Sequence, residues 1–163
     1  MYMINLSCCF FRTKKNNLEL QLSTATNDIP LFNFKGLKIL VKVVDIYDGD
    51  TFTGCFIFKD QIIKYKFRTI GYDTPEMKPS KSKPNREQEK IKAKEAREKF
   101  IEYSNCQNNL IIVECQQFDK YGRILGTVFN KQTSENINQK MIDNGYGLPY
   151  DGGTKKEFNF SDR

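Results

Sequence analysis

Three short segments of this 163-residue chain place carboxylates and arginines where their β-rich neighbours would predict apolar residues. They are 48–51, 68–76 and 119–123. Each lies at a strand end or turn, where a fold can gather polar side chains without burying them completely. Taken singly, each segment is typical of an ordinary turn. Taken together, in this order and on this strand pattern, they indicate one shared site.

The residue types in these segments suit the hydrolysis of a phosphodiester. Asp50 and Asp73 can offer carboxylate oxygens to a hard cation, and backbone carbonyls and water can complete a shell that suits Ca²⁺ better than Zn²⁺. Arg68 and Arg123 can neutralise a phosphate, and their contribution grows as charge builds in a pentavalent transition state. Glu76, beside such a phosphate, can orient or deprotonate a water molecule.

The composition removes most other hydrolytic mechanisms. The sequence has no histidine, which excludes Ser-His-Asp and Cys-His catalysis and every zinc site that needs an imidazole. Its five cysteines include no Cys-x-x-Cys pair, and Cys8 and Cys9 are adjacent. Neither a disulfide framework nor a zinc site is therefore indicated, and a reducing compartment is favoured.

Alternating hydrophobicity predicts the elements that must position the three segments. Period-two runs bounded by turn residues predict a three-stranded antiparallel meander over 37–47, 51–58 and 62–70. A helix and two further strands follow, over 86–104, 110–115 and 123–130. A short helix comes next, with Ser134 as its N-cap and Gly145 at its end. The order β-β-β-α-β-β-α predicts a mainly β, α+β protein: a five-stranded OB-fold Greek-key barrel with an inserted helix, a fold used for oligonucleotides.

The chain is predicted to comprise one folded domain, 37–150, between an N-terminal extension, 1–36, and a short C-terminal tail, 151–163. The role of the extension is unassigned. Its Leu18, Leu20 and Leu22 alternate with polar residues, which predicts one short strand.

The sequence predicts an intracellular, cytoplasmic protein. No apolar stretch is long enough for a transmembrane helix, and the start of the chain lacks the basic region and cleavage site of a signal peptide. Cys8 and Cys9 stand beside two phenylalanines and offer a place for acylation. A disordered or packed N-terminal tail is the favoured alternative. Nothing requires a dimer, so a monomer is expected.

Much of the net charge of +6 lies just past Glu76. Between Met77 and Lys99 nine basic residues stand against four acidic ones. A basic loop and helix suit a polyanion such as nucleic acid. A solvated helix face stabilised by Lys and Glu pairs explains the same composition equally well.

The motifs YDGDTF, RTIGYDTPE and DKYGRIL resemble the three signature segments of the staphylococcal nuclease (thermonuclease) family. The resemblance runs from about Lys38 to Tyr150 and keeps the order and spacing of that family. The stretches VVDIYDGDTF, GYDTPEMKPSK and GYGLPYDGG are also similar to the branch found in large DNA viruses of eukaryotes. Secreted bacterial members end in a third helix, whereas only a short tail follows Tyr150 in this sequence.

The resemblance implies a metal site and a set of catalytic groups. Asp50 and Asp73 match calcium-binding carboxylates, Thr74 matches a residue that binds calcium through its backbone carbonyl, and Asp48 would lie beside the metal. Arg68 and Arg123 match arginines that contact the scissile phosphate, and Glu76 matches the proposed general base. The residues implied to line the nucleotide are Lys120, Tyr121 and Tyr150.

The implied reaction is Ca²⁺-dependent endonucleolytic hydrolysis of DNA and RNA. Water attacks phosphorus in line and the 5′-oxygen leaves, so the products carry 3′-phosphates. The alternative is a non-catalytic OB-fold module that binds nucleic acid, since domains of this fold in eukaryotic scaffolds often lose the catalytic residues. Every catalytic position of the family is retained in this sequence, which favours an active enzyme. A packaging protein that uses the basic loop alone is a weaker rival.

Overall fold

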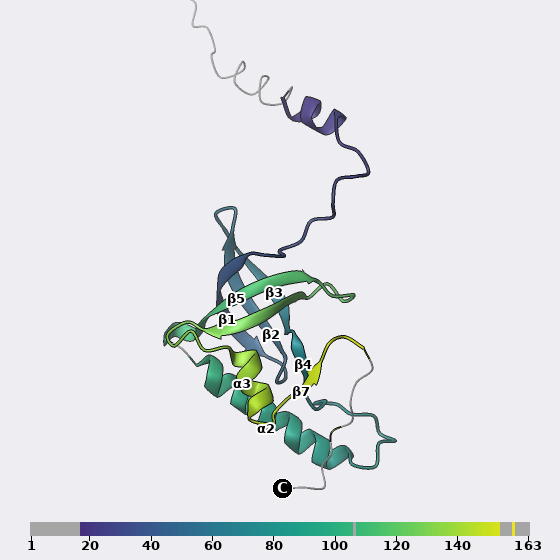
Figure 1. Ribbon diagram of the computed structural model, residues 1–163, viewed down its shortest axis with the longest axis vertical. Coiled ribbons are helices and arrows are strands. Elements are labelled where there is room, and N and C mark those ends of the chain that lie inside the picture. The colour runs from purple at the N-terminus through teal and green to yellow at the C-terminus, as the bar shows by residue number, and fades with distance from the viewer. Residues whose placement is uncertain (1–16, 106, 154–157, 159–163) are drawn as a thin grey trace, which may run out of the picture. The chain divides into compact units, whose positions relative to one another are not determined.

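Alternating apolar residues close five strands into a barrel (Figure 1). The computed structural model describes residues 17–105, 107–153 and 158. The barrel strands are β1 (Lys38–Ile46), β2 (Thr51–Phe58), β3 (Gln61–Thr69), β5 (Leu110–Phe118) and β6 (Ile124–Asn130). They run in the order β1-β2-β3-β6-β5, and β1 pairs with β5 to close the barrel. All pairs are antiparallel except β3 with β6. The predicted fold class, an α+β five-stranded OB-fold barrel, is confirmed.

The inward faces hold the residues that the period-two pattern selects. Phe52, Phe56 and Phe67 are buried, and the rings of Phe52 and Phe67 stack with centroids 5.0 Å apart. The hairpin between β2 and β3 turns through Lys59 and Asp60, both with positive φ, as a two-residue hairpin loop of the favoured twist requires. The sequence pattern therefore determines both the core and the register of this hairpin.

The segment just before β1 belongs to the barrel. The chain divides into two compact units, Met1–Phe32 and Asn33–Arg163. Phe34 in the second unit is buried, and its ring meets Phe56, Phe58 and Phe118 edge-on at centroid distances of 5.5, 5.3 and 5.7 Å. Phe34 thus extends the aromatic core to the ends of β2 and β5.

Two helices pack together beside the barrel (Figure 1). Helix α2 (Arg86–Ser104) has the predicted bounds and buries Ala93, Ala96 and Phe100 at helical spacing. Helix α3 (Ile137–Asp143) begins later than predicted, so Ser134 as its N-cap is wrong. Its cap is Asn136, whose side chain accepts a hydrogen bond from Gln139 N at 3.1 Å.

A small sheet outside the barrel was not predicted. Strand β4 (Gly71–Asp73) follows β3 almost directly and pairs antiparallel with β7 (Leu148–Tyr150), so that Gly71 lies opposite Tyr150. Strands of three residues are too short to show a hydrophobic alternation. This sheet brings the C-terminal part of the domain next to the end of β3.

The N-terminal unit differs from the expectation. Residues 17–23 form a helix, so the predicted strand is wrong. Leu18, Leu20 and Leu22 are all exposed, and within residues 17–32 there is no strand for them to pair with. Asn17 and Gln21 instead form the i,i+4 side-chain hydrogen bond of a helix, at 3.1 Å.

Among the described residues, no helix is both long and apolar enough to span a membrane. The described cysteines Cys55 and Cys115 are free thiols, and burial raises the pKa of Cys115 to about 11. Cys8 and Cys9 lie outside the described residues.

Candidate active site

One cleft of about 570 Å³ collects every residue that the sequence selects for chemistry. It lies where the turn between β1 and β2, the end of β3 and the hairpin between β5 and β6 meet. The predicted residues that line it are Asp50, Arg68, Asp73, Thr74, Glu76, Lys120, Tyr121, Arg123 and Tyr150, with Asp48 beside them. Three further polar residues of the cleft were not predicted to have a role: Tyr47, Thr51 and Asp119.

The turn between β1 and β2 is fixed from several sides. Asp48 Oδ1 accepts a hydrogen bond from Asp50 N at 3.1 Å, and the Tyr72 hydroxyl donates to Gly49 O at 2.7 Å. A Cβ on Gly49 would lie 3.0 Å from Ala96 Cβ, so the close approach of this turn to α2 requires glycine. The turn therefore presents Asp50 to the cleft in a defined position.

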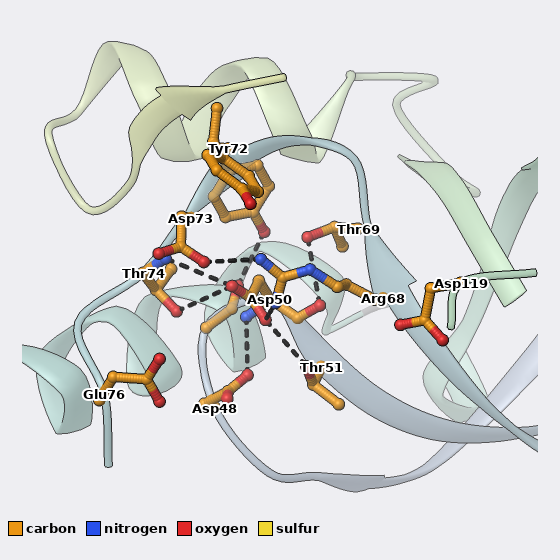
Figure 2. Close-up of polar contacts among 12 residues, drawn as sticks. Asp48, Asp50, Thr51, Arg68, Thr69, Tyr72, Asp73, Thr74, Glu76 and Asp119 are labelled. Atoms are coloured by element: carbon orange, nitrogen blue, oxygen red, sulfur yellow. Dashed lines mark hydrogen bonds and ion pairs between the residues drawn. The ribbon is translucent and has the colours of Figure 1, made fainter. Parts of the chain in front are cut away.

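Arg68 lies between two buried aspartates (Figure 2). Its Nη1 donates to Asp50 Oδ1 and its Nη2 to Asp73 Oδ1, both at 2.6 Å. Thr74 donates to Asp50 Oδ2 through its backbone N and its Oγ1, each at 3.3 Å. Burial opposes the charge of Arg68, yet Asp50 and Asp73 together raise its pKa above the ordinary value. The two bonds use two of the five N–H donors of the guanidinium, so donors remain for a phosphate oxygen.

The cluster around Arg68 holds more buried negative than positive charge. Asp48, Asp50 and Asp73 are all at most 9% exposed. Burial, followed by the charge of Asp50, raises the pKa of Asp48 to about 7. Hard oxygen donors with a surplus of negative charge fit a divalent cation such as Ca²⁺. Within the described parts of the chain, no three acidic, Cys or His side chains converge closely enough to hold a metal alone. Carbonyl or water oxygens would have to complete the shell.

We expect Asp48 to make the stability of the metal-free protein depend on pH. Its pKa rises from an ordinary 3.8 to about 7 on folding, so the folded state binds this proton more tightly than the unfolded chain. The contribution of Asp48 to the free energy of unfolding is therefore greatest below its ordinary pKa of 3.8. It is lost as the pH rises through about 7. Between about pH 5 and about pH 8 we expect the thermal unfolding midpoint of the metal-free protein to fall, and to fall less in Asp48→Asn. The matched control is Asp143→Asn, at an exposed position of α3. An equal fall in Asp48→Asn and wild type would show that another group carries the effect.

The hairpin between β5 and β6 holds the second arginine. Arg123 Nε donates to Asp119 Oδ2 at 2.6 Å, and Arg123 N donates to Asp119 Oδ1 at 2.9 Å. Arg123 Nη1 donates to Thr51 Oγ1 at 3.3 Å, and Thr51 Oγ1 donates to Asp50 Oδ1 at 2.8 Å. Partial burial opposes ionisation of Asp119, but the hydrogen bonds from Arg123 and Tyr121 lower its pKa overall. Thr51 and Asp119 thus link and orient the charged groups of the cleft.

A signal for Asp119 was present in the sequence. An aspartate four residues before an arginine, across a turn that contains glycine, can reach back to that arginine and to the turn amides. No comparable signal marked Thr51, because its contact with Arg123 joins residues 72 positions apart.

The remaining predicted residues surround this charged centre. Glu76 follows β4 and is exposed, and its backbone N donates to Glu89 Oε1 at 3.3 Å. Tyr121 is 72% exposed, with Lys120 Nζ 5.1 Å and Arg123 Cζ 5.4 Å from its ring centroid. Tyr150 reaches the cleft on β7, and its hydroxyl donates to Gly153 O at 3.1 Å.

The closed five-stranded barrel has the architecture of the OB-fold class, which includes domains that bind oligonucleotides. Residues 66–160, more than half of the chain, match the family described as staphylococcal nuclease homologue. The chain belongs to this family, as its motifs indicated. Comparison with curated proteins finds no match. Because the family match starts after Asp50, this residue joins the site through its contacts with Arg68 and Thr74.

Proposed function

We propose that this protein is a calcium-dependent nuclease that hydrolyses phosphodiester bonds in DNA and RNA. The observation that carries the proposal is the meeting of Arg68, Arg123 and Glu76 with the buried carboxylates Asp50 and Asp73 in one cleft. A surface that only binds nucleic acid needs cations, whereas buried carboxylates repel phosphate. Their presence beside two arginines therefore favours a metal-assisted reaction over binding alone.

The carboxylates of Asp50 and Asp73 and the carbonyl of Thr74 would hold the calcium ion. The bound ion would supply positive charge that polarises the phosphate and stabilises its transition state. Arg68 bonds to both aspartates and so fixes the orientation of their side chains. In its ionised form Asp48 would add negative charge next to Asp50, which would strengthen the attraction for a cation.

Glu76 is the general base in this proposal. Its exposed carboxylate would take a proton from a water molecule that attacks phosphorus in line with the departing 5′-oxygen. Cleavage of that bond leaves the phosphate on the 3′ side. Arg68 and Arg123 would donate to the non-bridging oxygens, whose charge increases in the transition state. Asp119 orients Arg123 for this role through two hydrogen bonds.

The nucleotide on the 3′ side would bind beside the hairpin of β5 and β6. Tyr121 offers an exposed ring between two cations, Lys120 and Arg123, which suits base stacking combined with phosphate contact. Tyr150, which lines the same cleft from β7, would contact the nucleotide through its half-buried ring.

The proposal predicts degradation of single-stranded DNA and of RNA when Ca²⁺ is present. We expect cleavage to stop when a chelator is in excess and to resume when Ca²⁺ is restored, because the buried carboxylates alone repel the substrate. End-group analysis of the products should find 3′-phosphates and 5′-hydroxyls. The measurement is gel analysis of end-labelled oligonucleotides across a series of metals, with Arg123→Ala as the inactive control. Equal cleavage under excess chelator would contradict the metal assignment.

The same experiment separates the enzyme from a non-catalytic module. Binding of the labelled oligonucleotide without cleavage, in every metal, would favour the binding module. Products with 5′-phosphates would contradict the assigned bond while leaving a nuclease in place.

A further inference from the structure

Glu89 is a charged residue buried in the first turn of α2, where it is only 1% exposed. The other buried positions of this helix are small or apolar, apart from Ser104 near its end. Removing a carboxylate from water is costly unless it is paired and hydrogen-bonded. The contacts of Glu89 therefore indicate which structural role offsets the cost of burying its carboxylate.

The two oxygens of Glu89 contact both ends of one loop. Oε1 accepts the hydrogen bond from Glu76 N at 3.3 Å. Oε2 lies 2.6 Å from Lys83 Nζ, in an ion pair whose side chains are 2% and 36% exposed. The loop between these contacts, 77–82, contains no helix or strand. A single buried carboxylate thus joins the start of the loop, its end and helix α2.

We propose that Glu89 is a positioning residue for Glu76 and that its ion pair with Lys83 fastens the loop along the rim of the active site. The inference rests on the proposed function, since Glu76 is the general base of that proposal. Glu89 does not line the cleft, and it acts on the reaction only through the backbone of Glu76. A base held in place loses less freedom when it aligns a water molecule for attack.

The proposal divides the lysines of the loop into two kinds. Lys83 forms the ion pair with Glu89 and so helps to position Glu76. Lys78 and Lys81 are exposed, and neither forms an ion pair with any residue that the structure describes. We expect these two exposed lysines to be the ones available to contact substrate phosphates.

The first test is a comparison of kinetic constants in two backgrounds. Glu89→Met preserves volume at a buried site and removes the buried charge, so the fold should be retained. We expect it to lower kcat about tenfold, with KM for a short single-stranded DNA changed by less than about twofold. Glu89→Gln, which keeps an acceptor for Glu76 N, should recover part of the rate. In a Glu76→Gln background, Glu89→Met should change the residual rate by less than about twofold. The same loss in both backgrounds would overturn the positioning role.

The second test uses a matched pair of substitutions, one within the loop and one at its end. Lys83→Gln should reproduce the fall in kcat of Glu89→Met. Lys81→Gln should leave kcat unchanged, raise KM for a long single strand and reduce the slope of log K against log salt by about 0.7. The same changes in kcat, KM and salt dependence in both variants would contradict a separate positioning role for Lys83.

Limited proteolysis tests the fastening of the loop without using nuclease activity. Cleavage after Lys81, which precedes Ser82, by a lysine-specific protease should be several-fold faster in Glu89→Met and Lys83→Gln than in wild type and Lys78→Gln. Unchanged rates of proteolysis would contradict the proposal that Glu89 and Lys83 hold the loop in place, even if the protein is an active nuclease. Faster proteolysis of the two variants, combined with a wild-type protein that hydrolyses no nucleic acid, would support the loop contact and contradict the proposed function.

Discussion

Replacing Arg68 by lysine should lower kcat/KM by about 10²–10³-fold, the scale expected when one transition-state donor is lost. The guanidinium spans two carboxylates through Nη1 and Nη2, both at 2.6 Å, and still has donors for a phosphate. A lysine ammonium keeps the charge, but it is a single point and cannot reproduce this planar fork. Arg123→Ala, which removes a charge altogether, should lower kcat/KM by at least as much.

Both arginine predictions are checked by initial rates on a fluorescent single-stranded DNA with saturating Ca²⁺, alongside thermal unfolding. Arg97→Lys is the matched control, because Arg97 donates to Ile46 O at 2.7 Å and does not line the cleft. It should keep its kcat/KM within about twofold. Rates near wild type in Arg68→Lys or Arg123→Ala would remove that arginine from the site. A loss that followed only from unfolding would be visible in the melting curve.

The second large effect concerns Glu76. Glu76→Gln preserves the shape of the side chain and its backbone bond to Glu89 but removes the base, so kcat should fall by about 10²–10⁴-fold. The bound water then has no group to take its proton in the transition state. Because Glu76 is exposed, unlike the buried carboxylates, its substitution should leave thermal stability nearly unchanged.

The pH dependence of kcat distinguishes a base from a group that merely binds. In wild type the rate should rise with pH as the base loses its proton, and in Glu76→Gln this acid limb should disappear. Calcium affinity, measured by calorimetry, should change little in comparison. Glu98→Gln on the exposed face of α2 is the control. An unaltered acid limb in Glu76→Gln would assign the proton transfer to another residue.

Local patterns were sufficient for most of the barrel and for the long helix. The strands around Phe52, Phe56 and Phe67 could be predicted because a buried face in a sheet imposes an alternation that each strand carries by itself. The bounds of α2 were accessible for the same reason, since its buried residues recur at helical spacing. Where the pattern was brief it misled: the alternating leucines in residues 17–23 lie on an exposed helix, with no strand in that unit's described part to pair with them.

The sequence by itself determined which residue types are available for chemistry. The absence of histidine and the presence of Asp50, Asp73, Glu76 and two arginines at turns do not depend on tertiary contacts. The family motifs indicated the same residues, and the family is confirmed. Their roles remain predictions that the experiments above can test.

Only the tertiary structure decided how these residues meet. The parallel pairing of β3 with β6 sets Arg68 opposite Leu125, two positions beyond Arg123. The unpredicted pairing of β4 with β7 places Tyr150 at the cleft. The packing of α2 buries Glu89, which then accepts a hydrogen bond from the backbone of Glu76. Each of these contacts joins segments that are distant in sequence or depends on which helix face is covered. Local periodicity leaves no trace of such pairings, because it reports whether a residue is buried and not which residue it will contact.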